Sequence, residues 1–117
     1  MDKVFRYGER FEFRAKRKTV SVYCRDIVFF ESYGHYVTIH MNNKTTYTTR
    51  CTITHLVDLL DDKTFARVHR GIIVNLEYVK KLNYTGAVLN SAWGRVPVSR
   101  SYRDVAEKAF EKFNNQK

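Results

Sequence analysis

The chain has 117 residues, enough for one compact core and too few for two domains of ordinary size, so we expect a single domain over residues 1–117. Hydrophobic residues make up 44% of the sequence and aromatic residues 15%, which excludes a disordered tail. The 21 Lys and Arg residues outnumber the 12 Asp and Glu residues and give a formal net charge of +9. Such an excess indicates a polyanionic partner, with nucleic acid ahead of an anionic membrane surface.

The cysteines and the hydropathy pattern indicate a cellular compartment. Cys24 and Cys51 form no CxxC pair and are too few for a disulfide scaffold, which favours a reduced, cytoplasmic protein. No apolar run approaches the roughly 18 residues that span a bilayer, and the N-terminal segment lacks the apolar core of a signal peptide. We therefore expect no membrane partner.

The first forty residues have the pattern of β-strands. Phe11 and Phe13 alternate with charged residues, the basic run 14–18 is typical of a turn, and residues 19–23 alternate again. The unbroken apolar run Ile27–Phe30 is more typical of a strand that is covered on both faces. Beta structure is therefore predicted for this part of the chain.

A hairpin is predicted for residues 35–50. Its strands are rich in Thr, Tyr and β-branched residues, and Asn42 and Asn43 supply the turn. His35 lies at the entrance of this hairpin, next to Gly34. By composition alone, a histidine at such a position is most often a solvated loop residue.

Two helices are predicted by the spacing of apolar residues. Thr52 can cap a helix of about two to three turns that ends at Asp61–Asp62. Ser99 can cap a second helix, from Ser101 to about Phe113. The first helix is expected to cover a sheet.

The segment between these helices has the pattern of further strands. Residues 78–84 and 87–89 are expected to be strands, followed by a turn over residues 90–94. Pro97 lies between two valines and indicates a sheet edge or a strand end.

The stretch FARVHRGIIVN, residues 65–75, combines cationic and apolar residues. Three basic or near-basic side chains precede the apolar run Ile72–Val74, with only Gly71 between them. A strand edge of this kind, continuing into a core, can present charge rigidly to an anionic partner. The three side chains are Arg67, His69 and Arg70.

Motifs for catalysis or metal binding are missing from the sequence. The four histidines and two cysteines occur at no spacing typical of zinc, and the five glycines form no phosphate-binding loop. Cys51 follows Arg50, but a cysteine in a Thr-rich strand is more often a packing residue than a reactive thiol. We expect no enzyme activity, no cofactor and no metal.

Five segments follow one another along the chain, namely IVFFES, GHYVTIH, YTTR before the short helix, FARVHRGIIVN and RVPVSRSY. In this order they resemble the LytTR family of DNA-binding domains, and the resemblance runs from about Val4 to Phe113. It implies a mostly β fold, an elongated stack of small β-sheets with a short internal helix and a C-terminal helix. It also implies sequence-specific binding of duplex DNA by a bacterial transcription regulator, as the output domain of a two-component response regulator.

The resemblance implies that projecting loops enter successive major grooves, and it assigns base reading to three side chains. These are His35 before the first strand of the hairpin, Arg70 after the histidine of the V-H-R motif, and Arg100 of the V-S-R motif. The chemistry agrees, because arginine can bond both O6 and N7 of guanine. Histidine is short and needs a close approach, which Gly34 would allow.

Other polar residues of these motifs are better suited to the DNA backbone or to the fold. We expect Arg67 and Asn75 to satisfy buried backbone groups. The apolar motif residues are expected in the core, namely Phe29, Phe30, Phe65, Ile73, Val74, Val96 and Val98. Contacts with phosphates are expected from Tyr36, Arg50, His69 and Ser99.

The chain departs from the family pattern in two respects. Some relatives carry a redox-sensitive cysteine just before the V-H-R histidine, where this chain has Val68, so no such switch is expected. The chain has no room for the receiver domain that often precedes a LytTR domain, so it is either an excised output domain or a DNA-binding module alone. Pairs of protomers are expected on direct-repeat DNA.

The two rival functions are an RNA-binding module, whose aromatic residues stack on unpaired bases, and a protein-interaction domain that uses its sheet edges.

Overall fold

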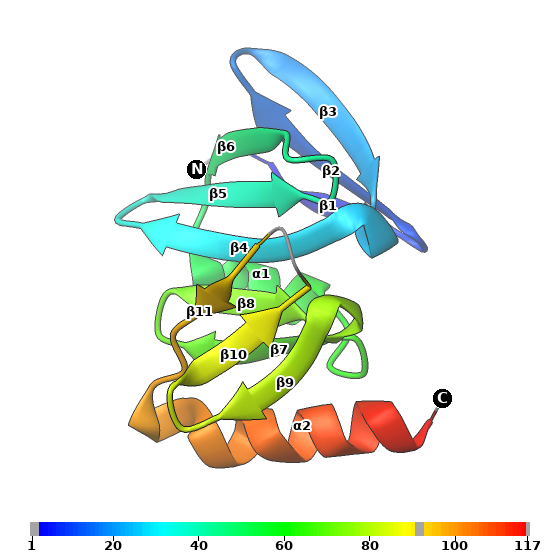
Figure 1. Ribbon diagram of the computed structural model, residues 1–117. Coiled ribbons are helices and arrows are strands. Elements are labelled where there is room, and N and C mark those ends of the chain that lie inside the picture. Colours follow the sequence, from blue (N-terminus) through cyan, green and yellow to red (C-terminus); the bar gives the residue numbers. More distant parts are fainter. Residues whose placement is uncertain (1–2, 91–92, 117) are drawn as a thin grey trace. The chain divides into compact units, whose positions relative to one another are not determined.

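The computed structural model describes residues 3–90 and 93–116, and it is mostly β, with small antiparallel sheets, a short internal helix and a C-terminal helix (Figure 1). This is the fold class that the sequence resemblance predicted. The chain divides into two compact units, residues 1–60 and residues 61–117. No helix among the described residues has the length and apolarity that crossing a membrane requires.

The first unit contains two sets of three antiparallel strands and one helix. The first set has the order β1-β2-β3, and in the second set β5 pairs with both β4 and β6. A 3₁₀ turn at Cys24–Asp26 connects the two sets. The elements are β1 (Phe5–Tyr7), β2 (Arg10–Ala15), β3 (Lys18–Tyr23), β4 (Ile27–Tyr33), β5 (Tyr36–Met41), β6 (Thr46–Arg50) and α1 (Ile53–Leu59).

The core of the first unit follows from the predicted alternation. Every second residue of β2 points inward, so that Phe11 and Phe13 are buried, while Ile27–Phe30 of β4 is buried throughout. The rings of Phe11 and Phe30 meet edge to face, with centroids 5.6 Å apart. Their burial removes large apolar surfaces from water and stabilises the sheets that carry the polar turns.

Helix α1 begins as predicted and ends earlier. The Thr52 hydroxyl accepts a hydrogen bond from the His55 amide at 3.2 Å, which confirms the N-cap. Leu60 is already extended, whereas the helix was expected to reach Asp61–Asp62. Asp61 has a different use, because its carboxylate accepts hydrogen bonds from the amides of Lys63 and Thr64 and so forms a turn.

The second unit contains a two-stranded hairpin, a three-stranded antiparallel sheet and the C-terminal helix. The hairpin pairs β7 with β8, and the sheet has the order β11-β10-β9. Two 3₁₀ turns, Leu76–Tyr78 and Arg100–Tyr102, lie between these elements. The elements are β7 (Phe65–His69), β8 (Ile72–Asn75), β9 (Val79–Asn83), β10 (Gly86–Leu89), β11 (Arg95–Val96) and α2 (Arg103–Asn115).

Residues 65–75 differ from the expected strand edge. The stretch is a hairpin in which Arg70 and Gly71 make a two-residue turn between β7 and β8. The pairing shifts register between Arg67 and His69, which interrupts the alternation that would reveal two strands. All seven apolar motif residues expected in the core are buried.

The end of the chain requires two corrections. Ser99 makes no side-chain cap, and its hydroxyl oxygen is buried with no hydrogen-bond partner among the described residues. A 3₁₀ turn precedes α2, which therefore starts at Arg103 and ends at Asn115 rather than spanning residues 101–113. Ser91 and Ala92, within the turn predicted for residues 90–94, lie outside the described residues.

Strand β11 is an edge strand, as Pro97 predicted. It lies close against β10 at Gly86, where a Cβ atom would stand 2.6 Å from the carbonyl oxygen of Val96. Gly86 also has a φ of +139°, which side chains rarely allow. A glycine is therefore needed at this position for the edge strand to pair.

Candidate nucleic-acid interface

The β4–β5 turn of the first unit presents His35. Gly34 and His35 form a two-residue turn, closed by the pairing of Tyr33 with Tyr36, and Gly34 takes the positive φ of +60°. His35 and Tyr36 are both exposed. Hydrogen bonding and repulsion by the Glu31 carboxylate raise the pKa of the Tyr33 phenol, which favours its neutral form beside this turn.

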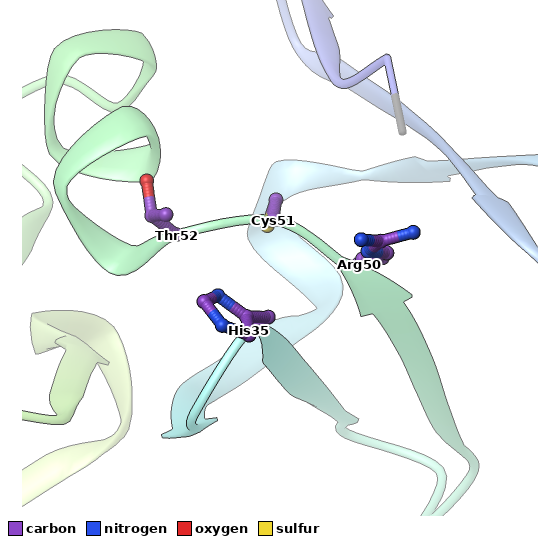
Figure 2. Close-up of a pocket in the computed structure, with 4 residues that line it drawn as sticks. All are labelled: His35, Arg50, Cys51 and Thr52. Atoms are coloured by element: carbon purple, nitrogen blue, oxygen red, sulfur yellow. The ribbon is translucent and has the colours of Figure 1, made fainter. Parts of the chain in front are cut away.

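Arg50 lies on the strand next to this turn. It is exposed at the end of β6, and the register pairs it with Tyr36. His35, Arg50, Cys51 and Thr52 line a small cavity of about 160 Å³. Figure 2 shows the His35 imidazole near the Arg50–Thr52 segment, while the Arg50 guanidinium points away from the ring. A base edge and a phosphate could therefore be contacted by adjacent side chains of one unit.

The β7–β8 turn of the second unit presents Arg70, which is exposed. One Arg67 nitrogen, Nη2, donates a hydrogen bond to the Arg70 carbonyl at 2.5 Å, and the Arg67 guanidinium lies over the Tyr102 ring. His69 Nδ1 accepts a hydrogen bond from the Gly71 amide at 3.1 Å, so the proton of the neutral ring is on Nε2. Two side chains of β7 thus hold the turn, and Nε2 of His69 remains a hydrogen-bond donor.

The Arg67 and Asn75 contacts agree with the structural role expected of these two residues. Arg67 satisfies the Arg70 carbonyl, although its Nε atom is buried with no hydrogen-bond partner among the described residues. Asn75 is fully buried, and its side-chain oxygen accepts a hydrogen bond from the Glu77 amide at 3.0 Å. Both residues therefore shape the hairpin that carries Arg70.

Arg100 begins the 3₁₀ turn before α2 and is exposed. The segment before it is tied to β7, because the Ser99 amide donates a hydrogen bond to the Val68 carbonyl at 2.9 Å. Arg67 reaches from β7 to the Tyr102 ring in the same 3₁₀ turn. Arg70 and Arg100 thus project from two segments of the second unit that are bonded to each other. The Ser99 hydroxyl, which was predicted to contact a phosphate, is buried.

Arg103 is a structural residue of this site that the sequence analysis missed. Its guanidinium donates hydrogen bonds to the carbonyls of Asn83 at 2.9 Å, Tyr84 at 2.8 Å and Val98 at 3.5 Å. These bonds tie the β9–β10 turn to the segment that leads to Arg100. A cation in the first turn of a helix interacts unfavourably with the helix dipole. The position of Arg103 at the start of α2 therefore indicated that its side chain bonds a group outside the helix.

The described residues hold no group of three or more His, Cys, Asp or Glu side chains placed to bind a metal ion. The site instead offers exposed cations and an imidazole on short, hydrogen-bonded turns. Rigid donors of this kind suit the oxygen and nitrogen acceptors of an anionic polymer.

The family model of the LytTr DNA-binding domain matches residues 17–111, which include parts of both units. The chain belongs to the LytTR family. It is therefore a DNA-binding domain of the kind found in transcription regulators, as the sequence resemblance predicted. Residue 68, where some members carry a cysteine, is a fully buried valine.

Curated LytTR relatives are longer than this chain. The sensory transduction protein LytT of Bacillus subtilis is 36% identical over 76 residues, covering 59% of this chain and 32% of the relative. The heme-containing CO-sensing transcriptional regulator RcoM 1 of Paraburkholderia xenovorans is 33% identical over 91 residues, covering 74% of this chain and 34% of the relative. The matched region thus spans about a third of each relative.

A solved structure shares the fold. It is the LytTr DNA-binding domain of a methyl-accepting/DNA response regulator from Bacillus cereus, with a TM-score of 0.73 and 22% identity. The match covers 88% of this chain and 97% of that chain. The likeness extends to nearly the whole of the other domain.

Proposed function

We propose that residues 1–117 act as one domain that binds specific duplex DNA in a bacterial transcription regulator. The observation that carries this proposal is the exposed Arg70 on a turn held by Arg67 and His69. A turn fixed before binding loses little conformational freedom on binding, so its arginine is well suited to bond O6 and N7 of a guanine.

His35 and Arg100 are the second and third base-reading residues of the proposal. The turns that carry the three residues would enter successive major grooves, and each would read a small part of the site. Exposed Tyr36 and Arg50, together with Nε2 of His69, would contact phosphates between them. A phosphate contact by Ser99 requires its side chain to rotate outward, because its hydroxyl is buried in the free protein.

The length of the relatives supports a proposal about the whole regulator. Because the matched region is about a third of LytT and of RcoM 1, we expect the domain to work as part of a longer chain. The family resemblance adds the expectation of a receiver domain upstream. Its site of action would be cytoplasmic DNA. Two protomers would bind side by side on direct repeats, each reading one repeat.

A second candidate function is favoured by the exposed aromatic side chains. Tyr84 is 85% exposed and Tyr33 is 64% exposed. Exposed aromatic rings can stack on the unpaired bases of RNA.

A competition experiment separates these functions. Labelled duplex DNA that carries a preferred site is expected to be displaced by the same duplex more readily than by random duplex or by single-stranded RNA. The affinity should fall as salt rises, because each phosphate that a lysine or arginine neutralises contributes about −0.9 to the log–log slope. Fluorescence anisotropy measures both quantities. Displacement by RNA ahead of duplex DNA, or a slope near zero, would contradict the proposal.

A further inference from the structure

The turn between β2 and β3 is the most concentrated positive charge of the sequence. Residues 14–18 read RAKRK, four cations in five positions with no acidic residue among them. Each of these cationic side chains is exposed. The turn closes the hairpin of the two blue strands β2 and β3 in Figure 1. None of the contacts described for the candidate interface uses it.

The backbone of this turn has an uncommon conformation for its residues. Ala15 pairs with Lys18, so Lys16 and Arg17 alone form the turn, and their φ angles are +50° and +66°. Two positive φ angles are typical of a type I′ turn, for which Asn-Gly is the favoured pair. Two long cationic side chains therefore occupy positions that local backbone preference would give to smaller residues. Strain of this kind is found at functional sites.

The neighbouring contacts hold the turn and leave its charges available. The Arg14 guanidinium donates a hydrogen bond to the Arg17 carbonyl at 3.0 Å, which stabilises the turn. Among the described residues, no acidic side chain forms a salt bridge with Lys16, Arg17 or Lys18. The cations are thus positioned by the backbone and are not neutralised by a described neighbour.

The surroundings of the turn offer further hydrogen-bond donors. Lys16 and Lys18 line a cavity of about 480 Å³ together with Thr46 and Thr48 of β6. The strand rise of about 3.4 Å per residue puts these threonines roughly 7 to 14 Å along β6 from Arg50. That interval corresponds to only a few phosphates of one DNA strand, which are spaced about 3.4 Å apart along the helix axis.

We propose that Lys16 and Arg17 at the β2–β3 turn form an additional contact with DNA phosphates, extending the footprint beyond the base-reading residues. This inference rests on the proposed function, because it takes the anionic partner to be the same duplex. Contacts with phosphates add affinity and salt dependence without reading sequence. The turn would therefore strengthen binding to specific and random duplexes alike.

Two variants of the turn separate its charge from its conformation. Lys16→Asn with Arg17→Gly removes two charges and installs the favoured turn pair, so its Tm should rise. Lys16→Gln with Arg17→Gln removes the same charges and keeps residues with a Cβ at both positions, so its Tm should not rise. Both variants are expected to bind duplex DNA on the order of tenfold more weakly at moderate salt, with a log–log salt slope shallower by about 1.8, two contacts at about 0.9 each.

The control variant carries Lys108→Gln and Lys112→Gln, which remove two exposed charges from α2. This variant should lose less affinity than the two turn variants, because the proposed contact depends on the position of the charges at the β2–β3 turn and not on the net charge. Wild-type affinity and salt slope in both turn variants, or an equal loss in the control, would overturn the inference while sequence-specific binding by the wild type stands. A wild-type protein that does not distinguish its site from random duplex would overturn the proposed function itself.

Discussion

Arg70→Ala and Arg100→Ala are each expected to weaken binding to the preferred duplex by about 1 to 3 kcal/mol and to relax base preference at one position. The loss arises because alanine leaves the O6 and N7 acceptors of a guanine without a partner. Both residues are exposed, so the folded state should retain its stability. Affinities for a panel of single-base variants of the site measure the effect.

Two controls make this result specific. Arg70→Lys keeps the positive charge but lacks the planar guanidinium group. It should therefore keep the electrostatic part of the affinity and lose part of the base preference. Lys112→Ala removes an exposed cation from α2 and should leave the preference unchanged. Equal losses of affinity on the preferred and random duplexes would show that Arg70 and Arg100 touch only phosphates.

Arg103→Met is expected to lower the free energy of unfolding of the second unit by about 3 kcal/mol. The side chain serves three carbonyl oxygens, and a net hydrogen bond from a charged donor is worth about 1.5 to 3 kcal/mol. The bond to Val98 is long and should contribute least. Denaturant unfolding, followed by the intrinsic fluorescence of Trp93, measures the loss.

Arg103→Lys and Lys108→Met provide the matched comparison. Lysine keeps the charge but cannot present the guanidinium fork, so stability should be recovered only in part. Lys108 is exposed on the same helix, and its change to methionine should have little effect. If Arg103→Met unfolds at the same denaturant concentration as the wild type, these carbonyl bonds do not hold the segment before Arg100.

The sequence predicted most strands of the fold because their burial follows simple patterns. Phe11 and Phe13 of β2 alternate with polar residues, and the run Ile27–Phe30 is buried throughout. The β7–β8 hairpin was missed because the register shift near Val68 interrupts its alternation. Strand β1 was not singled out within the predicted β region, because it has three residues and no buried face.

The candidate site was only partly predictable for a different reason. His35, Arg70 and Arg100 were assigned from family motifs, and those assignments remain predictions. The structural role of Arg67 was expected, whereas Arg103 was missed because it bonds the carbonyls of Asn83 and Tyr84, which lie 20 and 19 residues away in the sequence. No local pattern encodes such bonds, since the partner carbonyl belongs to the backbone and is present at every residue. The Ser99 cap was wrong because a 3₁₀ turn intervenes before α2.

Selection of bound sequences from a random duplex pool tests the central proposal most directly. We expect a shared motif that recurs in the same orientation at a fixed spacing. We also expect guanines at the positions whose preference is lost when the selection is repeated with Arg70→Ala or Arg100→Ala. Recovery of duplexes with no shared motif, or of the same motif from both variants, would contradict base reading by these arginines.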